Sequence, residues 1–166
     1  VCSSDLLEEL RKVKPDYPVE ATAAEIMLGD GKYKEALEWY AKANPANMSE
    51  DNFYNYGFAA YITKDYQRAL DVVKQGLQKF PNSEYLSRIA MMASVELKDY
   101  ASAINYGKVV FAGSGKKVAN DYDVCAKALC GAQQYDEAIN TVNKALEVDK
   151  NNIEPLKTLA AIYAAQ

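Results

Sequence analysis

The stretch Phe53 to Asn82 reads F-Y-N-Y-G-F-A-A-Y-I-T-K-D-Y-Q-R-A-L-D-V-V-K-Q-G-L-Q-K-F-P-N, and it decides the fold. Its first half has residues at spacings 0, 3, 4 and 7, which form one face of a helix: Phe53, Tyr56, Gly57 and Ala60. The pattern breaks at Lys64-Asp65, and a second amphipathic run then extends from Tyr66 to Pro81, where proline ends it. Gly57 and Ala69 are small enough to let two helices approach closely. The stretch therefore predicts an antiparallel helix hairpin.

The centre of this hairpin recurs three more times. It reads G-K-Y-K-E-A-L, K-D-Y-Q-R-A-L, K-D-Y-A-S-A-I and Q-Q-Y-D-E-A-I in chain order. The repeated tyrosines are 33, 34 and 35 residues apart: Tyr33, Tyr66, Tyr100 and Tyr135. A period near 34 with two helices in each repeat is the signature of tetratricopeptide repeats. At these residues the chain resembles that family.

The resemblance implies an all-α fold, a right-handed superhelical solenoid of antiparallel helix hairpins. It divides the chain into four full units and two partial ones: 1–16, 17–49, 50–83, 84–118, 119–152 and 153–166. The first of these has the apolar spacing of a second helix from a preceding unit, and the last begins a fifth hairpin. Asn152 is expected to cap that last helix, and Ser49 or Asp51 the first helix of the second unit.

The first residues, V-C-S-S-D-L, also match the translated end of a common sequencing adaptor. We expect Val1 to about Leu6 to be non-native sequence, and the chain to be a fragment of a longer, bacterial protein. The alternative is an ordinary helix start with Ser4 or Asp5 as its N-cap. Because a signal region can lie outside the fragment, the sequence does not decide between the cytoplasm and export to the envelope.

The third unit departs most from the repeat pattern. Gly107 stands where a large residue of the second helix is expected, and 113–115 (G-S-G) replaces the terminal proline. Glycine within a helix costs up to about 1 kcal/mol relative to alanine. We therefore expect this second helix to be the least regular, with a mobile loop after it. In the first unit, Asn44-Pro45 is expected to end the second helix early.

Composition and charge restrict the partners. The formal net charge is −4, and lysine and arginine are scattered, whereas nucleic acid binding favours a basic face. No apolar run approaches the roughly 20 residues of a membrane span. We therefore expect neither a nucleic-acid partner nor a membrane span in this fragment.

The sequence provides no catalytic constellation. It has no histidine, which excludes Ser-His-Asp and Cys-His arrangements and histidine-ligated zinc. On one helix, Cys125 and Cys130 would lie about 8 Å apart along the axis, too far apart for a disulfide. Together with Cys2 they are expected to be small buried hydrophobes. We expect no enzyme activity, no cofactor and no metal site.

A second aromatic stripe marks the candidate binding site. Tyr54, Phe58 and Tyr61 follow at i, i+4 and i+7, rotated by about 100° from the hairpin face. In proteins of the resembled family, the first helix of each unit faces an inner concave groove. The resemblance therefore implies a peptide-binding groove lined by eight residues: Tyr54, Phe58, Tyr61, Tyr85, Arg88, Met92, Asp123 and Lys127. Aromatic, methionine and arginine side chains are common anchors of binding surfaces. The alternative is that these rings complete the core.

The sequence thus favours a non-catalytic scaffold that binds a protein or peptide in this groove, with Arg88 and Lys127 orienting the ligand. The family's two-carboxylate clamp for chaperone tails is disfavoured, because only Arg88 has the required type of side chain. Two alternatives belong to other classes. The chain could be the interaction arm of a larger enzyme or sensor, or a structural array that self-associates through its open ends.

Overall fold

The computed structural model describes residues 4–166, and every regular element in that range is helical. Cys2 and the start of the V-C-S-S-D-L segment lie outside the described residues. The chain forms two compact units, 1–80 and 81–166. No helix of the described part is both long and apolar enough to cross a membrane.

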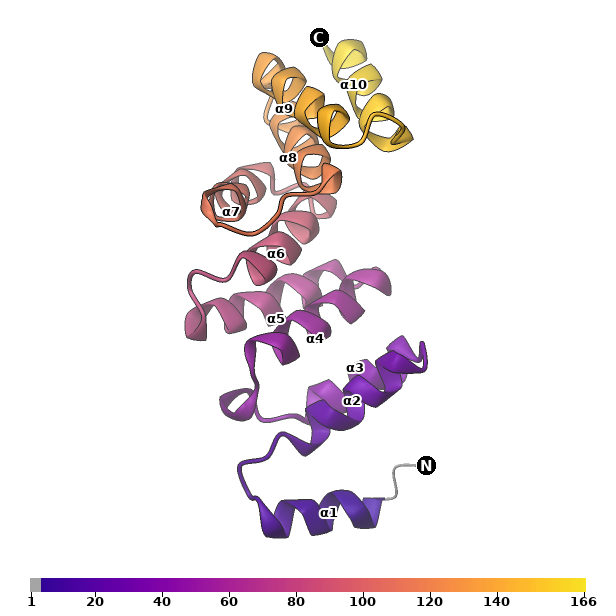
Figure 1. Cartoon of the computed structure of the whole chain (residues 1–166), viewed down its shortest axis with the longest axis vertical. Helices are drawn as coiled ribbons and strands as arrows, with labels where there is room; N and C mark the ends of the chain where they lie inside the picture. The colour runs from indigo at the N-terminus through magenta and orange to yellow at the C-terminus, as the bar shows by residue number, and fades with distance from the viewer. Residues whose placement is uncertain (1–3) are drawn as a thin grey trace. The chain divides into compact units, whose positions relative to one another are not determined.

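Over residues 4–80, the first unit contains five α-helices and a short 3₁₀ helix (Figure 1). They are α1 (Ser4–Val13), α2 (Val19–Gly29), α3 (Tyr33–Lys42), η1 (Pro45–Asn47), α4 (Glu50–Ile62) and α5 (Tyr66–Lys79). The pairs α2/α3 and α4/α5 form hairpins, and α4 also packs on both helices of the preceding hairpin. As expected, α3 ends just before Asn44-Pro45.

The second unit, which is described throughout, contains five α-helices. They are α6 (Glu84–Glu96), α7 (Tyr100–Ala112), α8 (Ala119–Gly131), α9 (Tyr135–Val148) and α10 (Ile153–Ala165). The pairs α6/α7 and α8/α9 form hairpins, α8 packs on both helices of the preceding hairpin, and α10 packs on α8 and α9. Each of the four full repeat ranges thus holds one helix pair, while their status as domain units stays a prediction.

Every hairpin turns through one residue with left-handed backbone. These residues stand at the same place in each repeat, with φ between 61° and 72°: Gly31, Lys64, Lys98 and Gln133. In the second hairpin, the Lys64 amide donates to the Tyr61 carbonyl and the Asp65 amide to the Ala60 carbonyl, at 2.9 Å each. This Schellman pattern ends the first helix by satisfying its last carbonyls.

The same turns also begin the second helices. Asp65 Oδ1 accepts the Arg68 amide at 3.2 Å, and Asp99 Oδ1 accepts the Ser102 amide at 3.1 Å. In the second and third hairpins, the residue that follows the left-handed position therefore caps the next helix. Ser49 caps α4 as expected, and its amide in turn donates to Asn52 Oδ1 at 3.0 Å, which completes a capping box.

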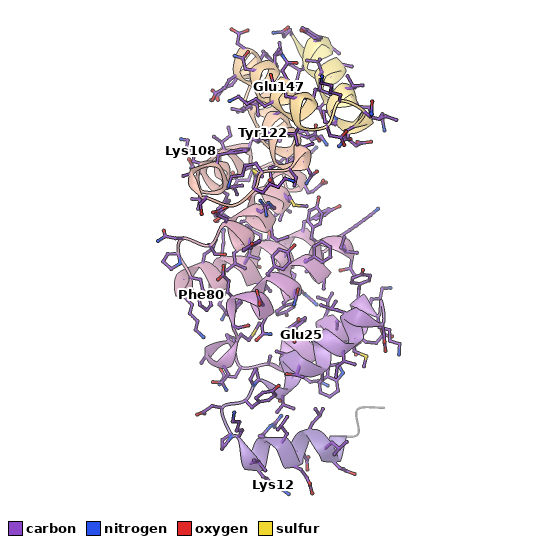
Figure 2. The ribbon with its side chains drawn as sticks, viewed as in Figure 1. Lys12, Glu25, Phe80, Lys108, Tyr122 and Glu147 are labelled. Atoms are coloured by element: carbon purple, nitrogen blue, oxygen red, sulfur yellow. The ribbon has the colours of Figure 1, made fainter. Side chains whose placement is uncertain are left out.

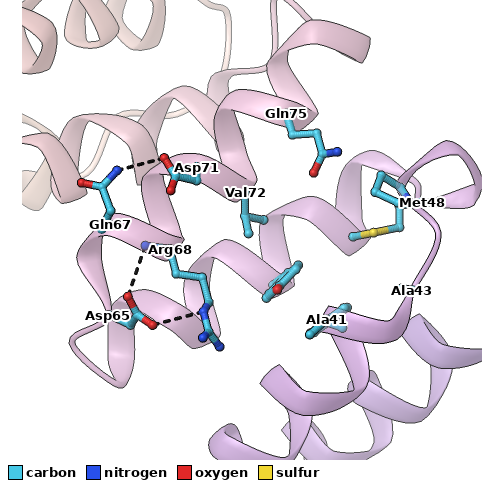
Figure 3. Close-up of a pocket in the computed structure, with 12 residues that line it drawn as sticks. Ala41, Ala43, Met48, Asp65, Gln67, Arg68, Asp71, Val72 and Gln75 are labelled. Carbon is cyan, nitrogen blue, oxygen red and sulfur yellow. Dashed lines mark hydrogen bonds and ion pairs between the residues drawn. The ribbon is translucent and has the colours of Figure 1, made fainter.

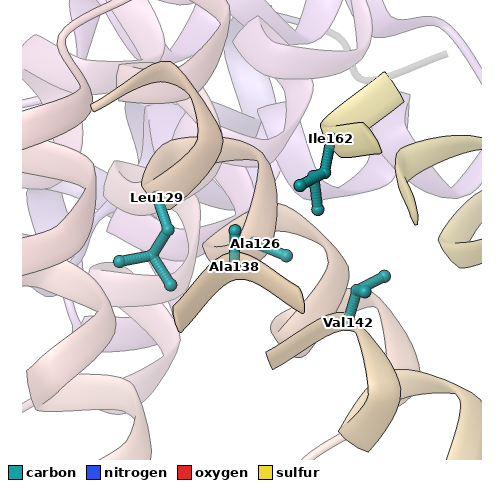
Figure 4. Packing of buried hydrophobic residues seen from close by; sticks show 5 residues of the cluster. All are labelled: Ala126, Leu129, Ala138, Val142 and Ile162. Carbon is teal, nitrogen blue, oxygen red and sulfur yellow. The ribbon is translucent and has the colours of Figure 1, made fainter. Parts of the chain in front are cut away.

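A fully buried alanine occupies the same position in the second helix of each hairpin. It stands three residues after the repeated tyrosine, and its exposed fraction is 0% in all four hairpins: Ala36, Ala69, Ala103 and Ala138. In the second unit, Ala138 belongs to a cluster contributed by α8, α9 and α10, shown in Figure 4. Its members are Ala126, Leu129, Ala138, Val142 and Ile162. The core is therefore distributed along the hairpins.

The expected irregularity of the third hairpin is wrong, because α7 is continuous over 13 residues. A Cβ at Gly107 would lie 3.3 Å from Met91 Sδ and 3.6 Å from Cys125 Sγ. Seven residues after the repeated tyrosine, the other hairpins carry Tyr40, Val73 and Val142. Nine residues before it, where this hairpin carries Met91, the others carry Ala24, Gly57 and Ala126. A large residue on α6 thus compensates for the missing side chain on α7.

Hydrogen bonds tie the loop after α7 to the start of α6. Lys117 Nζ lies 2.8 Å from Glu84 Oε2 and also donates to the carbonyls of Gly113 and Gly115. The Gly115 amide donates to Glu84 Oε1 at 3.1 Å. The Lys117 ammonium, with the Gly115 amide, lowers the pKa of Glu84. A Cβ at Gly113 would lie 1.9 Å from the Glu84 side chain, so glycine is required here for this contact.

The left-handed turns predict that Lys64→Gly stabilises the protein. A residue with a Cβ loses about 1–2 kcal/mol in this conformation, and the greater freedom of glycine in the unfolded chain offsets part of the gain. We expect the free energy of unfolding to rise by up to about 1 kcal/mol in denaturant titrations. The matched control is Lys74→Gly within α5, which should lower it by about the same amount. A loss of stability in Lys64→Gly would contradict the role of the turn.

Because Met91 on α6 fills the space beside Gly107 on α7, we expect mutations at these two positions to have non-additive effects on the free energy of unfolding. Met91→Ala alone should cost about 2–5 kcal/mol by leaving a cavity. Gly107→Val alone should cost about 1–3 kcal/mol by overpacking against the Met91 sulfur. The double variant reproduces the Ala126 and Val142 pair of the fourth hairpin. The double variant should therefore lose at least about 1 kcal/mol less unfolding free energy than the two single variants lose together. A double-mutant cycle measures this difference as a coupling energy. Strict additivity would show that the two side chains do not share one space.

Candidate functional site

The eight groove residues predicted from the sequence fall in both compact units. Tyr54, Phe58 and Tyr61 lie on α4 of the first unit, and we call these three side chains the aromatic stripe. The other five lie on α6 and α8 of the second unit: Tyr85, Arg88, Met92, Asp123 and Lys127. The predicted set is therefore divided into one group for each unit.

The aromatic stripe is half-buried rather than part of the closed core. The rings of Tyr54 and Phe58 stack with centroids 6.1 Å apart and planes 11° apart. Tyr61 packs against Tyr66 at the start of α5, with centroids 5.3 Å apart. In contrast, Phe53 on the neighbouring face of α4 is 1% exposed. The stripe thus offers pre-positioned aromatic rings with part of their surface accessible.

Arg88 is committed to an ion pair inside the second unit. Its Nε and Nη2 donate to the two carboxylate oxygens of Asp121, at 2.6 and 3.1 Å. The Asp121 side chain is 1% exposed and also accepts the Val118 amide at 2.9 Å. The guanidinium therefore links the middle of α6 to the first turn of α8. The ring of Tyr85, a residue that is 59% exposed, lies 5.9 Å from the Arg88 guanidinium carbon.

A comparable polar link joins first helices in the first unit. Asn52 Nδ2, at the start of α4, donates to Glu25 Oε1 on α2 at 2.6 Å; Glu25 is labelled in Figure 2. Asn52 and Asp121 occupy the same repeat position, fourteen residues before Tyr66 and Tyr135. In each unit a polar contact from this position therefore ties successive first helices together.

Asp123 and Lys127 form a pair on α8 with opposite environments. Asp123 is 2% exposed, whereas the Lys127 side chain is 40% exposed, and its Nζ lies 2.7 Å from Asp123 Oδ2. The other carboxylate oxygen, Oδ1, is buried without a hydrogen-bond partner among the described residues. Burial makes Asp123 an anchor for Lys127 rather than a surface that a ligand can reach.

Lys127 also lines a furrow of about 370 Å³ between α8 and α10, which we call the α8–α10 furrow. Its other side chains come mainly from α10 and the end of α8: Tyr100, Cys130, Glu154, Lys157, Thr158, Ala161 and Ile162. Lys157 Nζ lies 2.7 Å from Glu154 Oε1, and this ammonium lowers the pKa of Glu154. The Thr158 hydroxyl is buried without a partner in the described part of the chain.

The sequence did not predict a second hollow, of about 500 Å³, between α3 and α5 (Figure 3). Its wall contains the stacked rings of Tyr40 and Tyr56, with centroids 4.9 Å apart, and burial raises the pKa of both phenols. Polar residues at its mouth are paired with each other. Arg68 Nε lies 3.1 Å from Asp65 Oδ2, and Gln67 donates to Asp71 at 2.9 Å.

Neither described thiol takes part in a disulfide. Cys125 and Cys130 are both free, as expected, but they are half-buried rather than fully buried. Burial raises the pKa of Cys125 to about 11. Within residues 4–166, no group of three or more histidine, cysteine or acidic side chains could hold a metal ion.

Comparisons with known proteins agree with the hairpin architecture. No family model matches the chain. A TPR repeat-containing protein of Methanocaldococcus jannaschii is 22% identical over a 163-residue alignment that covers 96% of this chain. MamA from Desulfovibrio magneticus RS-1 superposes with a TM-score of 0.77 at 23% identity, over 88% of this chain and 82% of MamA. The chain has the tetratricopeptide-repeat fold.

A further tetratricopeptide structure supports the same fold. YrrB, a TPR protein with an unusual peptide-binding site, gives a TM-score of 0.77 at 16% identity, over 95% of this chain and 82% of YrrB. The resemblance seen in the repeated tyrosine motif is thus confirmed. The chain spans 28% of the length of the Methanocaldococcus relative.

The Arg88 ion pair predicts a structural effect for Arg88→Ala. Removal of the guanidinium leaves the Asp121 carboxylate buried without its charge partner, which should lower the free energy of unfolding by about 3 kcal/mol. The control is Arg68→Ala, which breaks an exposed pair with Asp65 and should cost below about 1 kcal/mol. Thermal and denaturant unfolding measure both. Equal, small losses would show that Arg88 is free to serve a ligand instead.

Proposed function

We propose that the chain is a non-catalytic scaffold that binds a peptide segment of another protein along its first helices. The observation that carries the proposal is the aromatic stripe, whose stacked Tyr54 and Phe58 rings remain half-exposed beside a closed core. Rigid aromatic side chains provide large contact area at a small cost in conformational entropy. YrrB, which shares this fold, has a peptide-binding site, and this supports the proposal.

In the second unit, the proposal assigns ligand contact to the exposed members of the predicted set. Tyr85 offers an aromatic ring, and Lys127 offers an ammonium beside the α8–α10 furrow. Arg88 and Asp123 do not contact the ligand in this proposal. Arg88 is paired with Asp121, and Asp123 is paired with Lys127. Lys127, rather than Arg88, would therefore orient a carboxylate or carbonyl of the peptide.

Self-association is a second candidate, favoured by the apolar side of α10. Ile153, Leu156 and Tyr163 are 63%, 49% and 59% exposed. Such a surface suits another helix, supplied by a second copy of the chain. The two candidates differ in location, because the aromatic stripe lies on α4 and the exposed apolar side chains lie on α10.

The test starts with peptides selected from a random display library against the whole 166-residue chain. Tyr54→Ser combined with Phe58→Ser should weaken the affinity of a selected peptide at least about tenfold, as expected for aromatic hot spots. The thermal melt should change little. Truncation of core aromatics would instead cost about 3–5 kcal/mol each.

The control is Lys74→Ser, an exposed change on α5, which should leave both binding and stability unchanged. A melt that collapses in the Tyr54 and Phe58 variant would assign these rings to the core and contradict the proposal. Sedimentation of the parent chain separates the second candidate. A dimer that persists in the aromatic variant and is lost in Leu156→Ser would favour self-association.

A further inference from the structure

A pocket of about 560 Å³ opens within the second unit between α7, α8 and α9. We call it the α7–α9 pocket. Its apolar wall is made by Phe111 and Tyr122, whose rings stack with centroids 4.9 Å apart and planes 28° apart. Gly107 and Cys125 also line it. None of the eight predicted groove residues contributes to it, so this pocket is separate from the proposed peptide surface.

The pocket includes Gly107, the position where α7 lacks a side chain and Met91 of α6 compensates. The compensating methionine comes from α6 and reaches Gly107 from within the hairpin, with its sulfur 3.3 Å from a Cβ placed there. The sulfur of Cys125 on α8 lies 3.6 Å from the same Cβ position. At Gly107 the α7–α9 pocket is thus lined by a residue without a side chain, whereas α5 and α9 carry Val73 and Val142 at this repeat position.

Positive charge surrounds the opening, although the whole chain carries a formal net charge of −4. Lys108 on α7 and Lys144 on α9 line the pocket and are exposed, and neither forms an ion pair with a described residue (Lys108 and Tyr122 are labelled in Figure 2). Glu137 is the acidic side chain in the lining. A third lysine, Lys117, is neutralised by Glu84 at 2.8 Å. The rim thus has an excess of one positive charge.

We propose that the α7–α9 pocket binds an aromatic carboxylate. The flat ring of the ligand would pack against the stacked pair formed by Phe111 and Tyr122, where aromatic contact and burial of apolar surface favour it. Its carboxylate would meet the ammonium groups of Lys108 and Lys144, which form charge-assisted hydrogen bonds with oxygen acceptors. The volume is in the range of small-molecule sites, which combine an apolar lining with a few placed polar groups.

The test is a titration of the whole chain with 2-naphthoate, followed by calorimetry or by amide chemical shifts. Binding should saturate, and Lys108→Gln and Lys144→Gln should each weaken it about three- to tenfold. The neutral isostere 2-naphthamide should bind more weakly than 2-naphthoate and be insensitive to both changes. Lys150→Gln, an exposed lysine outside the pocket, is the matched control and should change nothing.

Filling the pocket gives an independent variant. Thr141 lines it from α9 and is half-buried, so Thr141→Phe should occupy the space of the ligand ring and reduce 2-naphthoate affinity at least about tenfold. The lysine variants change only exposed side chains, and they keep the proposal testable if the phenylalanine variant folds poorly. Unchanged binding in all three variants would overturn the proposal.

The two free thiols within residues 4–166 provide a further measure, because Cys125 lines this pocket and Cys130 lines the α8–α10 furrow. Bound 2-naphthoate should slow the alkylation of Cys125 several-fold and leave that of Cys130 unchanged, as read from peptide masses. Labelling is done at about pH 9, because the Cys125 pKa is raised to about 11 and the thiolate is the reactive form. Equal protection of both thiols, or of neither, would overturn the assignment.

Aromatic carboxylates occur as free small molecules and as peptide C-termini that end in phenylalanine. A tetrapeptide Ala-Ala-Ala-Phe with a free carboxylate, compared with its amide, distinguishes the two sources. If the free acid binds more tightly than 2-naphthoate and the amide does not, the ligand is a peptide C-terminus. If 2-naphthoate binds and neither peptide does, the ligand is a small molecule.

Discussion

Each hairpin depends on one steric constraint, a buried contact that admits only a small side chain. The alanine three residues after the repeated tyrosine has no exposed surface in any hairpin: Ala36, Ala69, Ala103 and Ala138. Helices pack with axes about 8–10 Å apart, and the lower end of that range requires small residues at the crossing. Within each unit, the first helix of the second hairpin packs against both helices of the first hairpin. These contacts are those of α4 with α2 and α3, and of α8 with α6 and α7. The repeated core follows from this single contact.

In the third hairpin, a large side chain on one helix replaces a side chain that is missing from the other. The volume between its helices is provided by Met91 on α6, whose unbranched side chain adapts to irregular spaces, instead of by a residue on α7. Local sequence could not predict this outcome. A helix propensity scale assigns a cost to Gly107 but contains no term for Met91, sixteen residues earlier in the chain. The Met91 sulfur fills the space beside Gly107 within the hairpin, and Gly107 itself lines the α7–α9 pocket.

Most other features of the fold could be predicted because their determinants are local. The Lys64-Asp65 break and the Ser49 cap depend on residues within one helical turn, and the half-exposed aromatic stripe follows from its rotation around α4. The role of one predicted groove residue depends instead on a distant partner, and that of a second on its own burial. Arg88 reaches Asp121, 33 residues later, and Asp123 holds its lysine from a buried position. A charged side chain at a groove position can thus form an ion pair with the adjacent helix instead of binding a ligand. Residue type alone does not distinguish these two roles.

The polar links and the half-exposed rings have complementary consequences for recognition. Buried ion pairs contribute little net stability when compared with apolar packing, but they disfavour arrangements in which a charge loses its partner. The Arg88 and Asp121 pair therefore fixes how α6 meets α8, and the Asn52 and Glu25 contact does the same for α2 and α4. Binding surfaces gain affinity when their side chains are ordered before the ligand arrives. In the proposed scaffold, these contacts would therefore order the helix that carries the aromatic stripe in the first unit and, separately, the helix that carries Lys127 in the second.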